Sequence, residues 1–169
     1  LSGVDQALWD IKGKRANMPV YQLLGGKCRE AAACYAHAEG TTKEEIVDSI
    51  RGFMEEGYQY IRVQKGGYGG LSPNRPAPED SPEGAYYDPR SYVREHLEVF
   101  EHVREQLGFE IELCHDIHER LIPIDAVGFA KDMEKFKLFF LEDPLAPEDI
   151  EWFRNIRQQC STPIAMGEL

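Results

Sequence analysis

Three short apolar runs in the second half of the chain each stop at a carboxylate. The runs begin at Ile111, Leu138 and Pro163, and the carboxylates that end them are Asp116, Glu142 and Glu168. Short apolar runs bounded by polar or turn residues are typical of buried β-strands. We therefore predict three strands, each of which delivers a carboxylate at its C-terminal end.

Helical patterns separate these runs and also precede them. Apolar residues recur three or four positions apart in segments 1–14, 20–24, 42–57, 91–107, 123–136 and 147–156. Two further strands are predicted at residues 31–37 and 58–64. Strands that alternate with helices in this way form a parallel sheet. The pattern therefore predicts an α/β fold built from repeated βα units.

The carboxylates Asp116, Glu142 and Glu168 are separated by two equal intervals of 26 residues, which is about the length of one βα unit. The C-terminal ends of parallel strands share one edge of a sheet, so the three side chains are expected to converge there. Converging oxygen ligands suit Mg²⁺. The alternative is that each carboxylate caps the helix that follows it. His118 follows Asp116 by two positions, which places both side chains on the same side of a strand end.

The segment 66–90 interrupts the repeat. Its many glycines and prolines leave no room for a regular helix or strand. A segment of this length inside a compact fold is a functional lid, a disordered segment or a solvated surface loop, and the sequence leaves these alternatives open. As a lid, it could bring Tyr68, Asn74 and Arg75 to a site.

Composition and charge narrow the possible partners. The chain has 169 residues, of which 42% are hydrophobic, and a formal net charge of −11. It is long enough for one globular domain, and its negative charge argues against nucleic acid or an anionic membrane as a partner. No apolar run approaches the roughly 20 residues of a membrane-spanning helix. The four cysteines have no CxxC spacing, and free thiols fit a reducing cytoplasm.

Several motifs resemble the enolase superfamily. They are Asp116, Glu142 within Leu-Glu-Asp-Pro (141–144), Glu168 within Gly-Glu (167–168), and Ala-Leu-Trp-Asp-Ile-Lys-Gly-Lys (7–14). Three more features resemble the mannonate dehydratase subgroup of that superfamily: His118, Ile-Arg-Val-Gln (61–64) and Tyr-Ala-His (35–37). The resemblance covers essentially all of the chain.

The resemblance implies a TIM-type (β/α) barrel like that of mandelate racemase and muconate lactonizing enzyme. Residues 1–169 would form a partial barrel domain of about five βα units. The capping domain and the C-terminal barrel strands would then lie outside this chain. The expected protein is a cytoplasmic lyase that forms a homo-oligomer.

The activity that the resemblance implies is Mg²⁺-dependent dehydration of a six-carbon sugar acid, of the D-mannonate or D-gluconate type, to 2-keto-3-deoxy-gluconate. A proton is removed next to the carboxylate and the 3-hydroxyl leaves. By matching position, Asp116, Glu142 and Glu168 would bind the metal, His118 would protonate the leaving hydroxyl and contact substrate, Arg62 would support the base and contact substrate, and His37 would contact substrate.

The base departs from the family's pattern. The family has a tyrosine twelve residues after this arginine, where the present sequence has Asn74. Tyr68, six residues after Arg62, is the candidate to replace it. The alternative function is therefore a degenerate superfamily member that binds Mg²⁺ and an acid sugar or metabolite with little or no turnover. An unrelated α/β hydrolase is disfavoured, because the sequence has no G-x-S-x-G nucleophile motif.

Overall fold

The structure is a computed structural model that describes residues 1–66, 79–80, 82 and 88–168. The chain divides into two compact units, Leu1–Ala33 and Cys34–Leu169. The smaller unit contains α1 (Ser2–Ala16) and α2 (Val20–Leu23), in agreement with the predicted helices. Within it, α1 ends where Asn17 takes a left-handed conformation with φ of 51°, which asparagine tolerates better than most residues.

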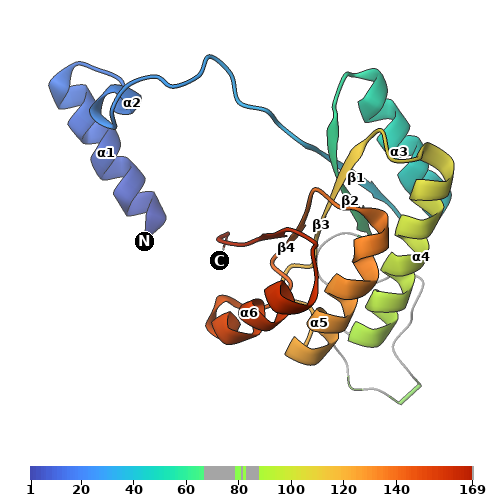
Figure 1. The fold of residues 1–169 in the computed structure, drawn as a ribbon. Coiled ribbons are helices and arrows are strands. Elements are labelled where there is room, and N and C mark those ends of the chain that lie inside the picture. The colour runs from blue at the N-terminus through green and yellow to red at the C-terminus, as the bar shows by residue number, and fades with distance from the viewer. Residues whose placement is uncertain (67–78, 81, 83–87, 169) are drawn as a thin grey trace. The chain divides into compact units, whose positions relative to one another are not determined.

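The larger unit is built on a five-stranded parallel sheet whose strands lie in chain order (Figure 1). The strands are β1 (Ala36–Gly40), β2 (Tyr60–Lys65), β3 (Glu112–Asp116), β4 (Phe140–Glu142) and β5 (Ile164–Ala165). The connecting helices are α3 (Lys43–Glu55), α4 (Pro89–Leu107), α5 (Pro123–Asp132), η1 (Met133–Phe136), η2 (Pro147–Asp149) and α6 (Ile150–Gln159). The predicted βα repeat and the fold class, part of a TIM-type barrel, are confirmed by five strands in chain order with helices in the four intervals between them.

Two predicted boundaries are wrong. The first strand was predicted at residues 31–37, but β1 begins at Ala36, because its pairing with β2 starts where Ala36 lies beside Ile61. Residues 31–33 belong to the smaller unit. The helix predicted at 123–136 is α-helical only to Asp132 and continues as the 3₁₀ turn η1.

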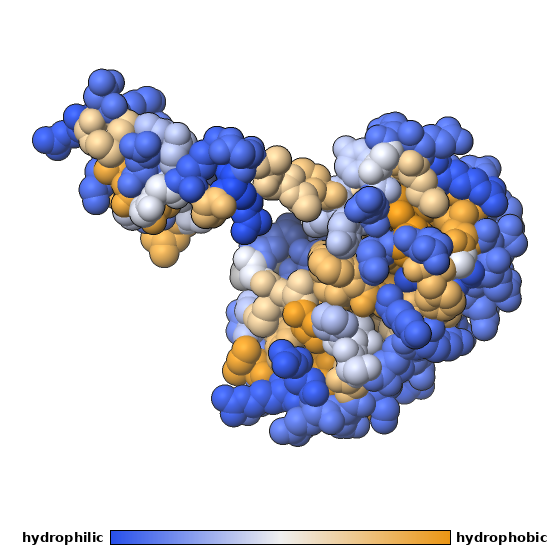
Figure 2. All heavy atoms as spheres, turned by 45° about the horizontal axis from the view of Figure 1, so that its top comes forward, coloured by the Kyte–Doolittle hydropathy of each residue, from blue (hydrophilic) through white to orange (hydrophobic). Residues whose placement is uncertain are grey.

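The core lies between the sheet and its helices. Successive helices from α3 to α6 pack against one another in chain order (Figure 1). The side chains that β2, β3 and β4 direct into this core are fully buried, and they are Ile61, Val63, Leu113 and Leu141. Figure 2 shows the result in the larger unit, with apolar residues toward the middle and charged residues around the rim. The opposite face of each strand is therefore left for polar side chains.

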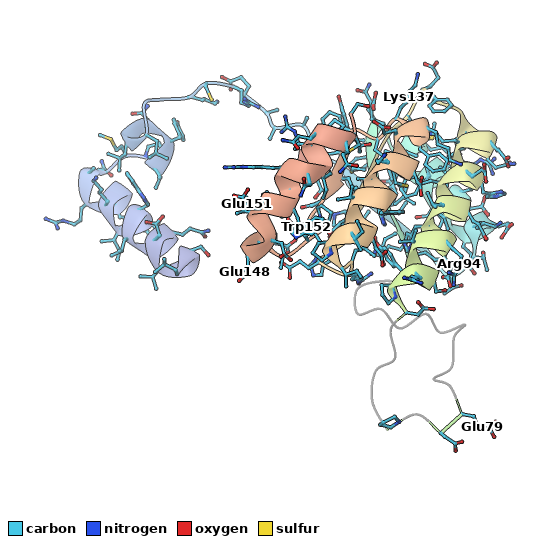
Figure 3. All side chains as sticks on the ribbon, turned by 60° about the horizontal axis from the view of Figure 1, so that its bottom comes forward. Glu79, Arg94, Lys137, Glu148, Glu151 and Trp152 are labelled. Carbon is cyan, nitrogen blue, oxygen red and sulfur yellow. The ribbon has the colours of Figure 1, made fainter. Side chains whose placement is uncertain are left out.

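The two ends of the sheet are distinguished by the helices. Each helix of a βα unit starts at the carboxyl end of the preceding strand and returns the chain to the amino end of the next. In Figure 3, Arg94 near the start of α4 and Glu148 near the start of α6 lie toward one end, whereas Lys137, which precedes β4, lies toward the other. The carboxyl edge of the sheet is therefore the end that carries the predicted site residues.

Arg104, in the last turn of α4, fixes the starts of β3 and β4. Its buried guanidinium donates to the carbonyl oxygens of Gly108 (3.0 Å) and Ile111 (2.9 Å), and to those of Phe136 (2.9 Å) and Lys137 (3.3 Å). These carbonyls lie in the turns that precede the two strands. One side chain thus satisfies backbone groups that would otherwise be buried without a partner.

Two histidines are buried among aromatic rings beneath the sheet. The His115 Nδ1–H donates to the Val63 carbonyl oxygen (2.8 Å), and its Nε2 accepts from the Tyr92 hydroxyl (2.8 Å). His96 Nδ1 contacts the Tyr92 carbonyl oxygen (2.9 Å), and the two imidazole rings are 4.7 Å apart. Burial lowers the pKa of His96 to about 4 and lowers that of His115 well below its ordinary value. Both rings are therefore neutral at pH 7.

This burial predicts that the protein loses stability as the pH falls from about 6.5 to about 4. The unfolded chain binds a proton at His96 throughout this window while the folded protein does not, so acidification favours unfolding by up to about 3 kcal/mol. In the full-length protein, His96→Phe should flatten the dependence of the free energy of unfolding on pH, as measured by urea denaturation. His102→Phe, at a partly exposed position of the same helix, should retain it. An unchanged slope in His96→Phe would contradict the prediction.

Candidate metal centre

The parallel register brings polar residues of neighbouring strands into one row at the carboxyl edge. Glu39 of β1 pairs with Gln64 of β2, and Asp116 of β3 pairs with Glu142 of β4. Because Arg62 pairs with Cys114, Gln64 and Asp116 lie at the same level. The row exists because all of these residues share the strand face that points away from the helices.

The predicted carboxylates fall into two groups that share one member. Ligand atoms of Asp116, His118 and Glu168 lie within 4.8 Å of one another, and so do those of Glu142, Asp143 and Glu168. The structure thus brings the three predicted metal ligands to one place, through Glu168. Their role in binding a metal stays a prediction.

Asp116 divides its two carboxylate oxygens between different surroundings. Oδ2 lies 3.4 Å from Arg62 Nη1 and 3.5 Å from His118 Nδ1. Oδ1 is buried and has no hydrogen-bond partner among the described residues of the chain. Burying an oxygen without a partner costs free energy unless a cation binds it or a hydrogen-bond donor contacts it.

Burial and neighbouring negative charges both affect the carboxyl groups of Glu142 and Asp143. Partial burial raises the pKa of the Glu142 carboxyl, and the nearby charges of Asp116, Asp143 and Glu168 raise it further. Burial and Asp116 likewise raise the pKa of Asp143. A divalent cation would offset this repulsion and would give Asp116 Oδ1 a partner. The set of oxygen ligands therefore fits a hard ion.

Arg62 is the fixed positive charge of the site. Its side chain is only 2% exposed, and it bridges two carboxylates, with Nη2 3.2 Å from Glu39 Oε1 and Nη1 3.4 Å from Asp116 Oδ2. A planar guanidinium can make two such contacts at once, whereas a lysine ammonium could not do so with the same geometry.

His118 lies beside Asp116 as predicted, but not for the predicted reason. β3 ends at Asp116, and His118 and Glu119 both take left-handed conformations, with φ of 58° and 60°. The turn is held by hydrogen bonds from Ile117 N–H to the Glu142 carbonyl oxygen (3.0 Å) and from Glu119 N–H to the Asp143 carbonyl oxygen (2.8 Å). Backbone hydrogen bonding to the loop after β4, rather than strand alternation, therefore places the imidazole.

Gln64 connects the site to the turn that carries His118. Its side-chain amide, in the orientation that satisfies both of its groups, donates to the Asp116 carbonyl oxygen (3.1 Å) and accepts from Arg120 Nη1 (3.0 Å). The Arg120 guanidinium also lies over the Tyr92 ring, 5.7 Å from its centroid. Alternation along β2 places Gln64 on the same face as Arg62, but the contact with Arg120 has no signal in the sequence.

His37 lies on the same face of β1, beside Arg62 in the register of the sheet. Its ring is exposed and stacks on Tyr35 at a centroid distance of 5.3 Å. Partial desolvation lowers the pKa of His37, and the positive charge of Arg62 lowers it further. The ring is thus accessible and neutral at pH 7, and its predicted contact with substrate stays a prediction.

Tyr68, the candidate base, lies outside the described residues, as do Asn74 and Arg75. Most of segment 66–90, for which a lid was one of three alternatives, also lies outside the described residues.

A parallel sheet of βα units with carboxylates clustered at its carboxyl edge is the arrangement of part of a (β/α) barrel. Residues 45–169 match the family described as enolase C-terminal domain-like, and residues 1–25 match the N-terminal domain of the mandelate racemase/muconate lactonizing enzyme family. The chain belongs to this enolase-type family.

Among its relatives, a D-galactonate dehydratase family member from Pantoea ananatis is 51% identical over all of this chain and 45% of its own length. A D-mannonate dehydratase from Caulobacter vibrioides is 43% identical over all of this chain and 44% of its own length. A crystal structure of an enolase from Pantoea ananatis with bound D-gluconate and Mg has a TM-score of 0.88 and 51% identity, covering 98% of this chain and 44% of that one. The chain therefore spans less than half the length of these proteins.

The match at residues 1–25 concerns the smaller unit. The prediction that all of 1–169 belongs to one barrel domain stays a prediction. Across the part of the chain that the structure describes, no helix combines the length and the apolar character that a membrane span requires.

The bridging role of Arg62 predicts that Arg62→Met destabilises the full-length protein by about 3–5 kcal/mol, because Asp116 is left buried without its cation. Urea denaturation with a chelator present would measure this change. Arg51→Met, which removes an exposed ion pair with Asp48 on α3, should cost less than about 1 kcal/mol. If both substitutions lowered the free energy of unfolding equally, the buried ion pair would contribute no more to stability than the exposed pair.

Proposed function

We propose that the full-length protein is a Mg²⁺-dependent sugar-acid dehydratase that acts on an acid of the D-mannonate or D-gluconate type. The observation that carries this proposal is the cluster of Asp116, Glu142 and Glu168 at the carboxyl edge, with Arg62 and His118 beside it. The named activities of the relatives, and the D-gluconate and Mg bound by the Pantoea ananatis enolase, support it.

In this proposal Asp116, Glu142 and Glu168 hold the ion, with Asp116 contributing the oxygen that faces away from Arg62. The ion supplies positive charge for the substrate carboxylate and for the negative charge that develops when the adjacent carbon loses its proton. Arg62 and His118 keep the other Asp116 oxygen in place, so that the carboxylate does not rotate. His37 binds the substrate from the β1 side.

In the proposed reaction, side chains of this chain supply both the base and the acid. A base, assigned to Tyr68, removes the proton from C2, and the electron pair forms a C2–C3 double bond as the C3–O bond breaks. His118 gives a proton to the departing hydroxyl, which leaves as water, and the enol rearranges to the 2-keto-3-deoxy acid. Arg62 stabilises the negative form of the base.

The proposal predicts that Asp116→Asn, Glu142→Gln and Glu168→Gln each lower the affinity of the full-length protein for Mg²⁺ by at least about 10-fold, because a charged ligand is lost. Calorimetric titration with Mg²⁺ would measure this. Glu148→Gln, at an exposed position in η2, should leave the affinity unchanged. Wild-type affinity in all three variants would remove the metal centre from the proposal.

The role of His118 predicts that His118→Asn lowers the rate of dehydration by roughly 10²–10⁴-fold, because the proton donor is lost. The affinity for Mg²⁺ should stay within a few-fold, because His118 is not assigned as a ligand. The measurement is turnover of D-mannonate and D-gluconate with Mg²⁺ present.

Two outcomes would change these assignments. Loss of Mg²⁺ binding in His118→Asn would make the imidazole a ligand instead of an acid. Binding of both sugar acids by the wild-type protein without turnover would favour the degenerate binding protein.

A further inference from the structure

The side chain of Gln64 spans the turn that carries His118. Gln64 is fully buried near the carboxyl end of β2. Its amide nitrogen donates to the Asp116 carbonyl oxygen (3.1 Å), and its amide oxygen accepts from Arg120 Nη1 (3.0 Å). Asp116 is the last residue of β3, and Arg120 lies just beyond the turn at residues 117–119. One side chain thus bridges the two ends of this turn.

Arg120 is also held from the side of α4. Its guanidinium lies over the Tyr92 ring, 5.7 Å from the centroid. The Tyr92 hydroxyl donates to His115 Nε2 (2.8 Å), and the His115 Nδ1–H donates to the Val63 carbonyl oxygen (2.8 Å). These contacts run from β2 through β3 and α4 to the turn, and they return to β2 through the amide of Gln64. The bridge is therefore part of a closed circuit of mostly buried groups.

Backbone hydrogen bonds hold the same turn on its β4 side. They run from Ile117 N–H to the Glu142 carbonyl oxygen (3.0 Å) and from Glu119 N–H to the Asp143 carbonyl oxygen (2.8 Å). Between them, His118 takes a left-handed conformation with φ of 58°, and its side chain is 31% exposed. Such a conformation persists where the surroundings hold it in place. The side-chain bridge supplies the restraint on the β2 side.

We propose that Gln64 is a positioning residue for His118. Its bridge from the Asp116 carbonyl oxygen to Arg120 fixes the turn, and the fixed turn keeps the imidazole beside the Asp116 carboxylate, where Nδ1 lies 3.5 Å from Oδ2. This inference rests on the acid role that the proposed function gives to His118. A displacement of about 1 Å in a reacting group can lower a rate by about 100-fold, so a restraint on this turn affects catalysis without touching the substrate.

The first test measures the turn without any substrate. Gln64→Met keeps a side chain of similar length but removes both hydrogen bonds of the amide. In the full-length protein with Mg²⁺ present, this change should raise the rate of hydrogen exchange at the Ile117 and Glu119 amides by about 10-fold, because two buried hydrogen bonds that hold the turn are lost. Hydrogen-exchange mass spectrometry of peptides that cover residues 117–120 would measure it.

Two controls separate this local effect from a general one. Gln59 is exposed and precedes β2, at the opposite end of the same strand, so Gln59→Met should leave exchange at residues 117–120 unchanged. Ile50 is buried on α3 and takes no part in the circuit. Ile50→Val should lower the stability of the whole protein and should also leave this local exchange unchanged.

The second test asks whether Gln64 acts through His118. Gln64→Met should lower kcat for dehydration of the sugar acid by at least about 5-fold. The affinity for Mg²⁺ should stay within about 3-fold, below the 10–100-fold change that is typical of groups that orient a metal ligand, because pairing with β4 keeps Asp116 in place. In a His118→Asn background, the same change should alter kcat by less than about 2-fold, since the residue that it positions is already absent.

Two results would overturn the inference. They are wild-type exchange at residues 117–120 in Gln64→Met, and an equal loss of kcat with and without His118. Should Gln64→Met fail to fold, Arg120→Met removes the other half of the bridge at a partly exposed position and decides by the same limits. Because exchange is measured without substrate, a protein that dehydrates no sugar acid would refute the proposed activity, while the exchange rates would still decide whether Gln64 holds the turn.

Discussion

The ion pair between Arg62 and Asp116 is the interaction on which the site depends. Both groups are almost completely buried, and two opposite charges in such a place stabilise each other only when their geometry is fixed. The sheet supplies that geometry, because β2 and β3 are neighbours and their register places Arg62 beside Cys114, two residues before Asp116. On the β1 side, the partly exposed Glu39 forms a second ion pair with the Arg62 guanidinium.

Charge balance at the carboxyl edge follows from this pair. Four carboxylates gather there, those of Asp116, Glu142, Asp143 and Glu168, and Arg62 is paired with Asp116 and Glu39. Burial raises the pKa of Glu142 and of Asp143, and the neighbouring carboxylates raise both pKa values further. An arrangement of this kind is unfavourable for folding by itself and becomes favourable when a divalent cation binds. The negative cluster is thus better explained by metal binding than by helix capping, since neither α5 nor α6 has a side-chain hydrogen bond at its cap.

The parts of this arrangement that follow periodic rules could be predicted from the sequence. Apolar runs located β3, β4 and β5, and the equal spacing of Asp116, Glu142 and Glu168 followed from a repeated βα unit. The start of β1 could not be predicted, because the alanines at 31–33 continue an apolar run but have no partner strand. The left-handed turn at His118 and the hydrogen bond from Asp143 N–H to the Ala165 carbonyl oxygen depend on contacts between loops 22 or more residues apart in the sequence, for which a local pattern contains no signal.

The two oxygens of Asp116 separate the roles of its neighbours. Oδ2 faces Arg62 and His118, and Oδ1 is directed elsewhere, buried and without a hydrogen-bond partner in the described part of the chain. A metal ion bound at Oδ1 would therefore not compete with the imidazole for the same oxygen. The His118 imidazole lies beside Oδ2, on a turn held by two backbone hydrogen bonds. Under the proposed function, this division would let one carboxylate hold a metal through Oδ1 and orient an acid through Oδ2.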